Sequence, residues 1–596
     1  MGLLTRKLIL FGICLAIAVV LVIRLIQLQL LNQEEYGRES QKNAVKTITI
    51  TPARGLMFGR NNQIVVDNRP TYTVTITPNE FDTTKFAEVS LLLGIPEDKL
   101  KEELRKVKGT NRFNPQRIKR DVDFKTIAYI AENEKLLHGV DYQVESLRLY
   151  SDKFRASHIF GYVKEISEKQ LANQIGDYYK QGDLIGVKGL EKTYEDYLRG
   201  EKGYEFVNVD VKGREIGSVN DGRDDILPVN GSDIYLSMDE QLQEYTEMLM
   251  KNKRGAVIAM DPRNGEILCM VSNPDFDLNI FSGPTDPKIL SALMTDKDKP
   301  MFNRVTMTNY PPGSTWKMMM GLAGLASGDI TTTSTISCPG AFVYGGRTFG
   351  DHGAYGSINI TRALEVSANT FFYKLALQLG LDNYHKYSAM FGFGKKTGID
   401  ISDELPGRLP SVEYYNKVYG VGKWTQGFIV SLGIGQGELG VTPVQMVAYT
   451  SAIAMDGLYT TPHFVRKIVN SNTKEEIYPT FKTTKIDFPQ KWFDAIKKGM
   501  FLVVNGNGTA KGIKNSMYTL AGKTGTAQTQ GNNHSWFVGY APYEDPKIAI
   551  CVLGENAGWG AQFAAPLAAA VMVRYLSGNT IDSFDEEGVK IFQTVD

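Results

Sequence analysis

The sequence predicts an α+β protein with an N-terminal transmembrane helix, a mixed first region and a C-terminal region built on an antiparallel sheet flanked by helices. Three observations predict this fold class. An unbroken apolar run covers residues 8–23. Residues 33–230 carry both period-two strand patterns and helical patterns. Strand-like segments stand at both ends of residues 231–596, with helical segments between them. We therefore expect domains at 1–32, 33–230 and 231–596.

The N-terminal run predicts a membrane anchor rather than a cleaved signal peptide. Arg24 interrupts it, but residues 25–31 stay apolar on one side. A snorkelling arginine lets the segment reach the roughly 20 residues that a bilayer requires. The run is long for a signal-peptide core, and no small-x-small cleavage site follows it. Because Arg6 and Lys7 precede the run, we expect the N-terminus in the cytoplasm and a large extracytoplasmic body.

The region from 33 to 230 reads as a structural or docking module, because it shows no concentration of reactive side chains. A polar segment at 34–46 predicts a helical continuation of the anchor. Hydrophobic periodicity predicts strands at 47–51, 72–76 and 204–211, and helices at 86–93, 97–107 and 124–137. A polar, turn-rich stretch at 220–230 marks its end.

The region from 231 to 596 opens with a β-hairpin, since residues 256–260 and 267–271 flank a Pro-Arg-Asn-Gly turn. Helices are expected at 239–250, 361–379, 443–454, 492–504 and 566–576, and further strands at 518–523, 536–540 and 548–553. This order predicts one antiparallel sheet with helices packed around it.

Composition excludes some classes of function. Lys plus Arg and Asp plus Glu both number 66, so no basic excess argues for a nucleic-acid partner. The four cysteines are scattered without a C-x-x-C pair, which predicts neither a disulfide framework nor a zinc ribbon.

The strongest candidate for chemistry is the turn Pro311-Pro312-Gly313 and the apolar helix expected after it. Ser314 would sit at the helix N-terminus, where unpaired N–H groups and the helix dipole favour negative charge. Lys317 follows three residues later and shares a helix face with Ser314. Together they could form an activated nucleophile. A capping serine followed by a solvated lysine is the alternative interpretation.

Two later patterns favour the catalytic interpretation. Ser367-Ala368-Asn369 stands within the helix expected at 361–379, and Lys523-Thr524-Gly525 ends an expected strand. Serine acyl-transfer enzymes use the ordered set Ser-x-x-Lys, Ser-x-Asn and Lys-Thr-Gly. Each pattern alone is weak, but all three occur here in that order.

With these motifs the sequence resembles the penicillin-binding protein and serine β-lactamase superfamily, and more closely a class B penicillin-binding protein. Arg54-Gly55 resembles the pedestal opening of class B enzymes, Gly189-Leu190-Glu191 their next signature, and 433–437 the segment between the second and third motifs. The resemblance implies an elongated pedestal of the dimerisation type over 33–230 and a transpeptidase domain over 231–596. The pedestal length and the lack of added C-terminal domains resemble the elongation-type member, with a septal-type member as the alternative.

The resemblance implies a peptidoglycan D,D-transpeptidase of the bacterial inner membrane, active in elongation and cell shape. Ser314 would attack the penultimate D-alanine of a stem peptide, release the terminal D-alanine and form an acyl-enzyme. A neighbouring stem's amine would then resolve it as a cross-link, and penicillin would bind the same serine covalently. The alternatives are a D,D-carboxypeptidase or a non-catalytic penicillin sensor or scaffold.

The resemblance also assigns the remaining catalytic residues. Lys317 would act as the base if burial and the nearby charge of Lys523 favour its neutral form. Ser367 and Asn369 would relay the proton and hold the substrate amide.

Substrate binding would fall to the third motif. Lys523 and Thr524 would bind the terminal carboxylate. Gly525 and Thr526 complete the substrate-binding set, and backbone N–H groups of Ser314 and Thr526 would form the oxyanion hole.

No cofactor or metal is expected. Zinc near Cys338, Asp351 and His352 is the alternative, because some elongation-type relatives carry zinc nearby. The further cysteine that those relatives have close to the second motif is missing here. His534, near the third motif, would either shape the cleft or serve packing.

The expected partners are peptidoglycan stem peptides, a polytopic membrane glycosyltransferase of the shape, elongation, division and sporulation family, and elongation-complex membrane proteins. The resemblance places the contact with the glycosyltransferase on the anchor and pedestal. No nucleic acid is expected.

Overall fold

A computed structural model describes residues 2–27, 45–107, 109–173, 176–210, 215–529 and 531–577. The chain forms two compact units. The first comprises 1–53, 70–145 and 200–230, and the second comprises 54–69, 146–199 and 231–596. The domain bounds at 32 and 230 stay a prediction.

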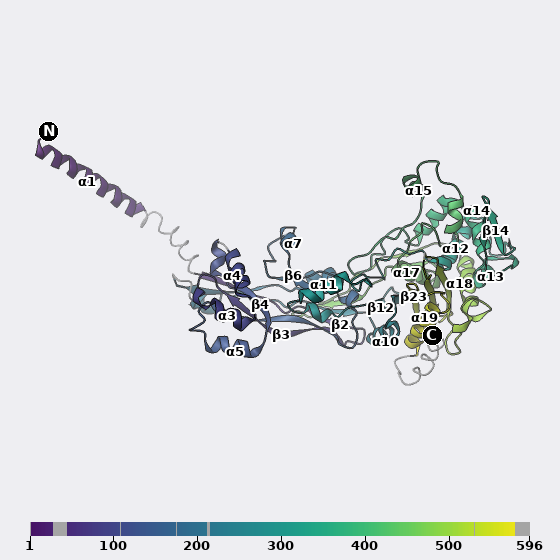
Figure 1. Ribbon diagram of the computed structural model, residues 1–596, viewed down its shortest axis with the longest axis horizontal. Coiled ribbons are helices and arrows are strands. Elements are labelled where there is room, and N and C mark those ends of the chain that lie inside the picture. The colour runs from purple at the N-terminus through teal and green to yellow at the C-terminus, as the bar shows by residue number, and fades with distance from the viewer. Residues whose placement is uncertain are drawn as a thin grey trace. The chain divides into compact units, whose positions relative to one another are not determined.

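The N-terminal helix α1 (Leu3–Ile26) lies at the purple end of the ribbon in Figure 1. Its stretch Lys7–Ile26 has a mean hydropathy of 3.0, and its apolar side chains are exposed. Of the helices in the described part of the chain, this is the one long and apolar enough to cross a bilayer. Of the polar helix expected at 34–46, residues 34–44 lie outside the described part of the chain.

The first unit contains two sheets, as the mixed pattern predicts. In one, β8 (Gly203–Val209) pairs antiparallel with β1 (Val45–Ile50) and β9 (Glu215–Ser218). In the other, the C-terminal half of β3 (Ile64–Ile76) pairs with β4 (Gln116–Val122). The second sheet packs on three helices: α3 (Phe86–Leu93), α4 (Glu97–Lys106) and α5 (Phe124–Glu132). The three helices predicted in this region are therefore confirmed, with α5 ending five residues early.

The second unit is built on a five-stranded antiparallel sheet of order β12-β11-β23-β22-β21 (Figure 1). The strands are β11 (Gly255–Met260), β12 (Ile267–Asn273), β21 (Ala521–Ala527), β22 (His534–Ala541) and β23 (Ile548–Gly554). The predicted hairpin is β11 and β12, and the predicted antiparallel sheet is confirmed.

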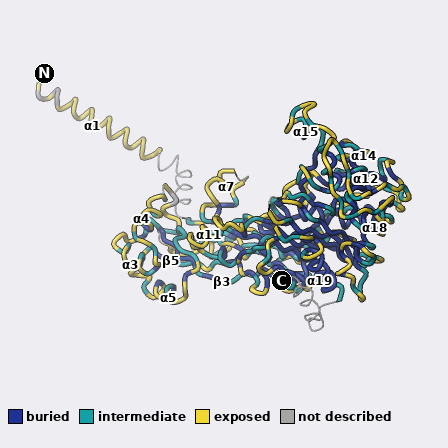
Figure 2. The backbone as a smooth tube through the Cα atoms, turned by 45° about the vertical axis from the view of Figure 1, so that its right-hand side comes forward, coloured by how far each residue is buried: buried dark blue, intermediate teal, exposed yellow. Residues whose placement is uncertain are grey.

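Both faces of this sheet are covered, so its strands are apolar on both sides. Cys551 and Leu553 of β23 face one core with α17 (Pro443–Ala454). Ile550 and Val552, one residue out of step, face a second core with α19 (Ala564–Leu576). Figure 2 shows α19 and the interior of this unit in the dark blue of buried residues. A sheet held from both sides is a rigid support for side chains at its edge.

The helix predicted at 361–379 is wrong in one respect, because it is two helices. α13 (Ile360–Glu365) and α14 (Asn369–Met390) are separated by a break at residues 366–368. Ser367 there has a φ of 58°, a left-handed conformation that ends α13. α14 is itself kinked at Gly380, which has a φ of 69° and directly follows the predicted helix end at 379.

An ion network centred on a buried glutamate joins the first two segments of the second unit, 54–69 and 146–199. Arg54 donates to Glu191 at 2.6 Å and to Glu195 at 2.5 Å, and Arg148 donates to Glu191 at 2.7 Å. Glu191 is fully buried and Arg148 is 2% exposed. Arg148 also donates to the carbonyl of Gly55 at 2.7 Å. The Arg-Gly and Gly-Leu-Glu patterns of the sequence therefore serve this network.

We predict that Glu191→Gln destabilises the protein by roughly 3–5 kcal/mol, because it leaves two buried guanidinium groups short of negative charge. The measurement is the thermal unfolding midpoint of the full chain in detergent. Glu476→Gln, which breaks the exposed Lys467–Glu476 pair, is the control and should cost about 0–1 kcal/mol. Equal midpoints for the two variants would contradict this account.

Candidate active site

Ser314 lies in a single 3-10 turn, Gly313–Trp316, that leads directly into α12 (Lys317–Ser327). Gly313 has a φ of 58°, and a Cβ there would come within 2.6 Å of the carbonyl oxygen of Thr526. Only glycine satisfies both conditions. The N–H of Gly313 donates to the carbonyl of Gly435 at 2.9 Å. The turn is therefore held between the 433–437 segment and the end of β21.

Lys317 is fully buried, and its ammonium nitrogen has three oxygen partners. Nζ donates to the carbonyl of Ser367 at 2.6 Å, to Oδ1 of Asn369 at 2.6 Å and to Oγ of Ser367 at 3.1 Å. Burial, reinforced by the positive charge of Lys523, lowers the pKa of Lys317 well below its ordinary 10.5, against an opposite effect of Asp351. The neutral amine is thereby favoured, and a neutral amine can accept a proton.

Ser367 connects the two lysines of the site. Its Oγ lies 3.1 Å from Nζ of Lys317 and 3.0 Å from Nζ of Lys523, and the residue is 3% exposed. Lys523 donates to Oγ, and the hydroxyl can either accept from Lys317 or, when that amine is neutral, donate to it. The left-handed backbone at Ser367 places the hydroxyl between the lysines, as strained residues at functional sites often do.

Lys523 stands inside β21, opposite Val538 of β22, and is fully buried. Burial lowers the pKa of Lys523 to about 7. Its Nζ donates to the Ser367 hydroxyl and, at 3.2 Å, to the carbonyl of Thr524. Two lysines that share one hydroxyl repel each other when both are charged, so the pair favours a state with one neutral amine.

Asp351 has a role that the sequence did not predict. Its Oδ1 accepts from the N–H of Asn369 at 2.8 Å and its Oδ2 from the N–H of Thr370 at 2.7 Å. The carboxylate thus caps α14, although it stands 18 residues before the helix and the local cap position, Ala368, has no capping side chain. Because Asn369 contacts Lys317, this cap also fixes a partner of the buried amine.

The residues near Asp351 do not fit a zinc ion. Both Asp351 oxygens are engaged by the helix, and burial with the neighbouring carboxylate raises the pKa of Cys338 to about 11. A structural zinc takes four ligands, and Asp351, Cys338 and His352 would supply at most three. Across the described residues, no group of three or more His, Cys, Asp or Glu side chains is placed to hold a metal.

A cavity of about 780 Å³ opens over these residues. Six of the eight predicted site residues line the cavity: Ser314, Ser367, Asn369, Thr524, Gly525 and Thr526. The remaining two, Lys317 and Lys523, are buried beside it. The structure thus gathers the predicted residues in one cleft. The lining also contains side chains that the motifs did not predict, chiefly the amides Gln436, Asn507, Gln528, Asn533 and Gln562, with Arg362 and Trp559.

Some of the unpredicted residues hold the third motif in place. Thr509 and Thr524 share a hydrogen bond of 2.6 Å between their hydroxyls. The Gln436 side chain donates to the carbonyl of Thr526 at 3.1 Å. These residues carry no sequence signal of their own, since isolated threonines and glutamines are common on any loop.

Fold and cleft are those of a transpeptidase of the penicillin-binding type, and family models agree. A penicillin-binding protein transpeptidase domain matches residues 255–573, and a penicillin-binding protein dimerisation domain matches 49–236. The chain belongs to the penicillin-binding protein transpeptidase family, and the predicted resemblance to its class B, elongation-type members is confirmed.

Individual proteins of this family are similar to the chain over most of its length. The chain is 34% identical over 582 residues to the peptidoglycan D,D-transpeptidase MrdA of Acinetobacter baumannii, covering 93% of this chain and 86% of that protein. The structure of the penicillin-binding protein PBP2 from Helicobacter pylori in a complex with MreC is similar, with a TM-score of 0.79, 29% identity and coverage of 90% and 99%. A structure that describes how a peptidoglycan synthase complex coordinates polymerization and crosslinking is also similar, with a TM-score of 0.69 and 26% identity. The match covers 97% of this chain and 100% of that chain.

We predict that the purified chain carries well under one zinc ion per molecule, because both Asp351 oxygens already accept from α14 and at most three ligand candidates are present where a structural zinc takes four. Elemental analysis after dialysis against zinc-containing buffer measures the content. A chelator should leave the thermal unfolding midpoint unchanged. Stoichiometric zinc whose removal lowers that midpoint would contradict the assignment of Asp351 as a helix cap.

Proposed function

We propose that this chain is a peptidoglycan D,D-transpeptidase that cross-links stem peptides through an acyl-enzyme on Ser314 during cell-wall elongation, and that penicillin acylates the same serine. The observation that carries the proposal is the Ser367 hydroxyl held between the amines of Lys317 and Lys523 beside a cleft lined by Ser314. The name of the MrdA relatives supports the reaction.

In the first half-reaction, Oγ of Ser314 attacks the carbonyl of the penultimate D-alanine while its proton passes to the neutral amine of Lys317. The C–N bond to the terminal D-alanine then breaks. Its nitrogen receives the proton from Lys317 by way of the Ser367 hydroxyl, which contacts Nζ at 3.1 Å. Free D-alanine leaves, and Ser314 carries the acyl group as an ester.

The third motif orients the substrate for this attack. Lys523 in its charged form and the Thr524 hydroxyl bind the terminal carboxylate as charge-assisted partners. Asn369 holds the substrate amide. The N–H groups of Ser314 and Thr526 stabilise the oxyanion, a contribution of about 3–4 kcal/mol per donor in comparable sites. The close packing of Gly313 on Thr526 supports this pairing.

In the second half-reaction, the amine of a neighbouring stem peptide attacks the ester, forms the new amide and frees Ser314. Water in place of the amine would make the chain a D,D-carboxypeptidase. The curated relatives favour the transpeptidase, since they are named for that activity.

We further propose that α1 anchors the chain in the inner membrane with the cleft on the extracytoplasmic side. The length and hydropathy of α1 support the anchor, and the basic residues before it support the orientation. A polytopic glycosyltransferase of the elongation machinery would supply nascent glycan, with other elongation-complex membrane proteins as further partners. Two similar structures, one of PBP2 with MreC and one of a peptidoglycan synthase complex, support this class of partner.

We predict that Ser314→Ala abolishes covalent labelling of the full chain in membranes by a fluorescent penicillin, because no other hydroxyl can replace the attacking oxygen. Ser327→Ala, at the far end of the same helix, is the matched control and should be labelled like the wild type. Persistent labelling of Ser314→Ala would overturn the nucleophile.

The same variant distinguishes the alternatives when lipid-linked precursor and a polymerase are supplied. The wild type should form cross-linked dimers of stem peptides that Ser314→Ala does not form. Release of D-alanine without dimers would indicate a carboxypeptidase, and labelling without either product would indicate a sensor.

A further inference from the structure

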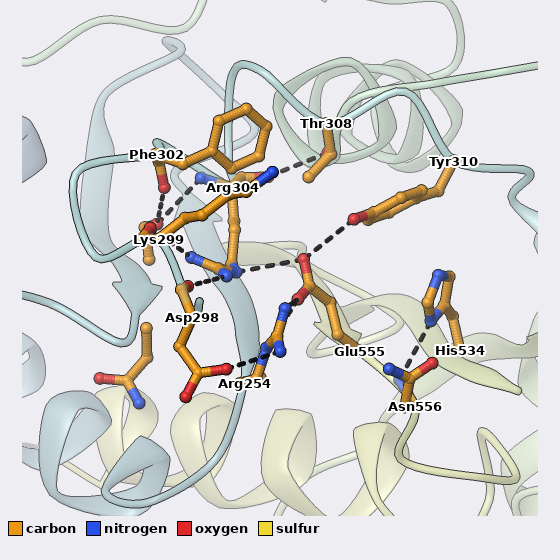
Figure 3. A network of polar contacts seen from close by, with 12 residues as sticks. Arg254, Asp298, Lys299, Phe302, Arg304, Thr308, Tyr310, His534, Glu555 and Asn556 are labelled. Atoms are coloured by element: carbon orange, nitrogen blue, oxygen red, sulfur yellow. Dashed lines mark hydrogen bonds and ion pairs between the residues drawn. The ribbon is translucent and has the colours of Figure 1, made fainter. Parts of the chain in front are cut away.

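A polar network surrounds the buried carboxylate of Glu555 (Figure 3). Glu555 directly follows β23 and is 7% exposed. Its Oε1 accepts from Nε of Arg304 at 3.1 Å and from the hydroxyl of Tyr310 at 3.1 Å. Its Oε2 accepts from Nε and a terminal nitrogen of Arg254 at 3.1 and 2.9 Å.

The two arginines fix the position of this carboxylate. Arg304 is 1% exposed, and its remaining nitrogens donate to the carbonyls of Lys299 at 3.2 Å and Asp298 at 2.6 Å. Arg254 also donates to the Asp298 carboxylate at 2.7 Å. A buried charge with this many donors has one favoured orientation. Tyr310 therefore donates to an acceptor that does not move.

Tyr310 is the network member nearest in sequence to Ser314. Burial and the charge of Glu555 raise the pKa of Tyr310 to about 12, so its hydroxyl keeps its proton and donates. Its backbone pairs with Val441 in both directions, at 3.3 and 2.9 Å. Only Pro311, Pro312 and Gly313 separate it from Ser314. Since each proline has a fixed φ, a displacement of Tyr310 is passed on to the turn that holds Ser314.

The ring of Tyr310 also contacts the other side of the cleft. His534 lies against it with 4.5 Å between ring centroids, and Nδ1 of His534 accepts from the N–H of Asn556 at 3.0 Å. His534 begins β22 and pairs with Ala527 of β21, the residue after Thr526. Tyr310 thus joins the turn of Ser314 to the strand end that carries Thr526.

We propose that Glu555 is a positioning residue that acts through Tyr310 to set the spacing between the backbone N–H groups of Ser314 and Thr526. This inference rests on the proposed function, in which those two groups bind the oxyanion. The spacing matters in the transition state, where charge develops on the carbonyl oxygen, and much less in the non-covalent complex. Loss of the Tyr310 bond should therefore slow acylation without weakening the preceding binding step.

The test is stopped-flow acylation of the full-length chain by a fluorescent penicillin, resolved into the dissociation constant of the non-covalent complex, Ks, and the acylation rate constant, k2. We expect Tyr310→Phe to lower k2 about tenfold, less than the loss of a whole oxyanion donor, and to leave Ks within about twofold. Tyr518→Phe, which removes a hydrogen bond to Leu576 far along the chain, is the matched control and should not change k2.

Glu555→Gln, alone and combined with Tyr310→Phe in a double variant, tests whether Glu555 acts through Tyr310. If Glu555 acts through Tyr310, the double variant should have the k2 of Glu555→Gln alone, because the hydroxyl has already lost its fixed acceptor. The inference would be overturned if the two substitutions lowered k2 independently, so that their effects multiplied in the double variant. An unchanged k2 in Tyr310→Phe, or an effect of that variant on Ks alone, would also overturn it. Should Glu555→Gln fail to fold, Tyr310→Phe decides alone.

The outcomes also separate this inference from the proposed function. A wild type whose penicillin adduct maps to a residue other than Ser314 would overturn both. Normal acylation of Ser314 in the wild type with an unchanged k2 in Tyr310→Phe would overturn the positioning role alone.

Discussion

The site depends on one hydroxyl shared by two buried amines. Ser367 Oγ accepts from Lys317 at 3.1 Å and from Lys523 at 3.0 Å, and neither lysine is exposed. Two ammonium groups at this separation in a dry site cannot both stay charged without a large penalty. Burial lowers the pKa of both lysines, and the charge of Lys523 lowers that of Lys317 further, which favours what the proposed acyl transfer requires: one neutral amine to take a proton and one cation to bind a carboxylate. The strained backbone of Ser367 and the Asp351 cap on α14 both hold this arrangement.

The sheet gives the arrangement its rigidity. β21 carries Lys523 and is one strand of a sheet that has a packed core on each face. The turn of Ser314 lies directly on it, and a Cβ at Gly525 would come within 2.7 Å of the carbonyl of Pro312. Backbone contact this close leaves little freedom between the turn of Ser314 and the third motif. The Glu555–Tyr310 bond connects the residues before this turn to the end of β23, another strand of the same sheet.

Local sequence patterns predicted much of the fold and of the site, and contacts between residues far apart in the sequence account for the rest. The hairpin at 256–271, the helix at 443–454 and the cleft residues followed from periodicity and from three ordered motifs. The break at Ser367 did not, because a left-handed serine leaves the apolar spacing of its helix intact. Asp351 caps a helix 18 residues away, and Glu555 meets Tyr310 across 245 residues, so no local signal exists for either contact. Asp351 shows the consequence, since its type and neighbours suggested a metal ligand and its geometry makes it a cap.

The pH dependence of the acylation rate tests the shared-hydroxyl account most directly. We predict that the rate rises with pH through a pKa well below 10.5, as Lys317 loses its proton, and falls above about 7, as Lys523 loses the proton with which it binds the carboxylate. Lys523→Arg should remove the falling limb, because a guanidinium stays charged. A rate that keeps rising to about pH 10 in the wild type, as for an ordinary lysine base, would contradict the account.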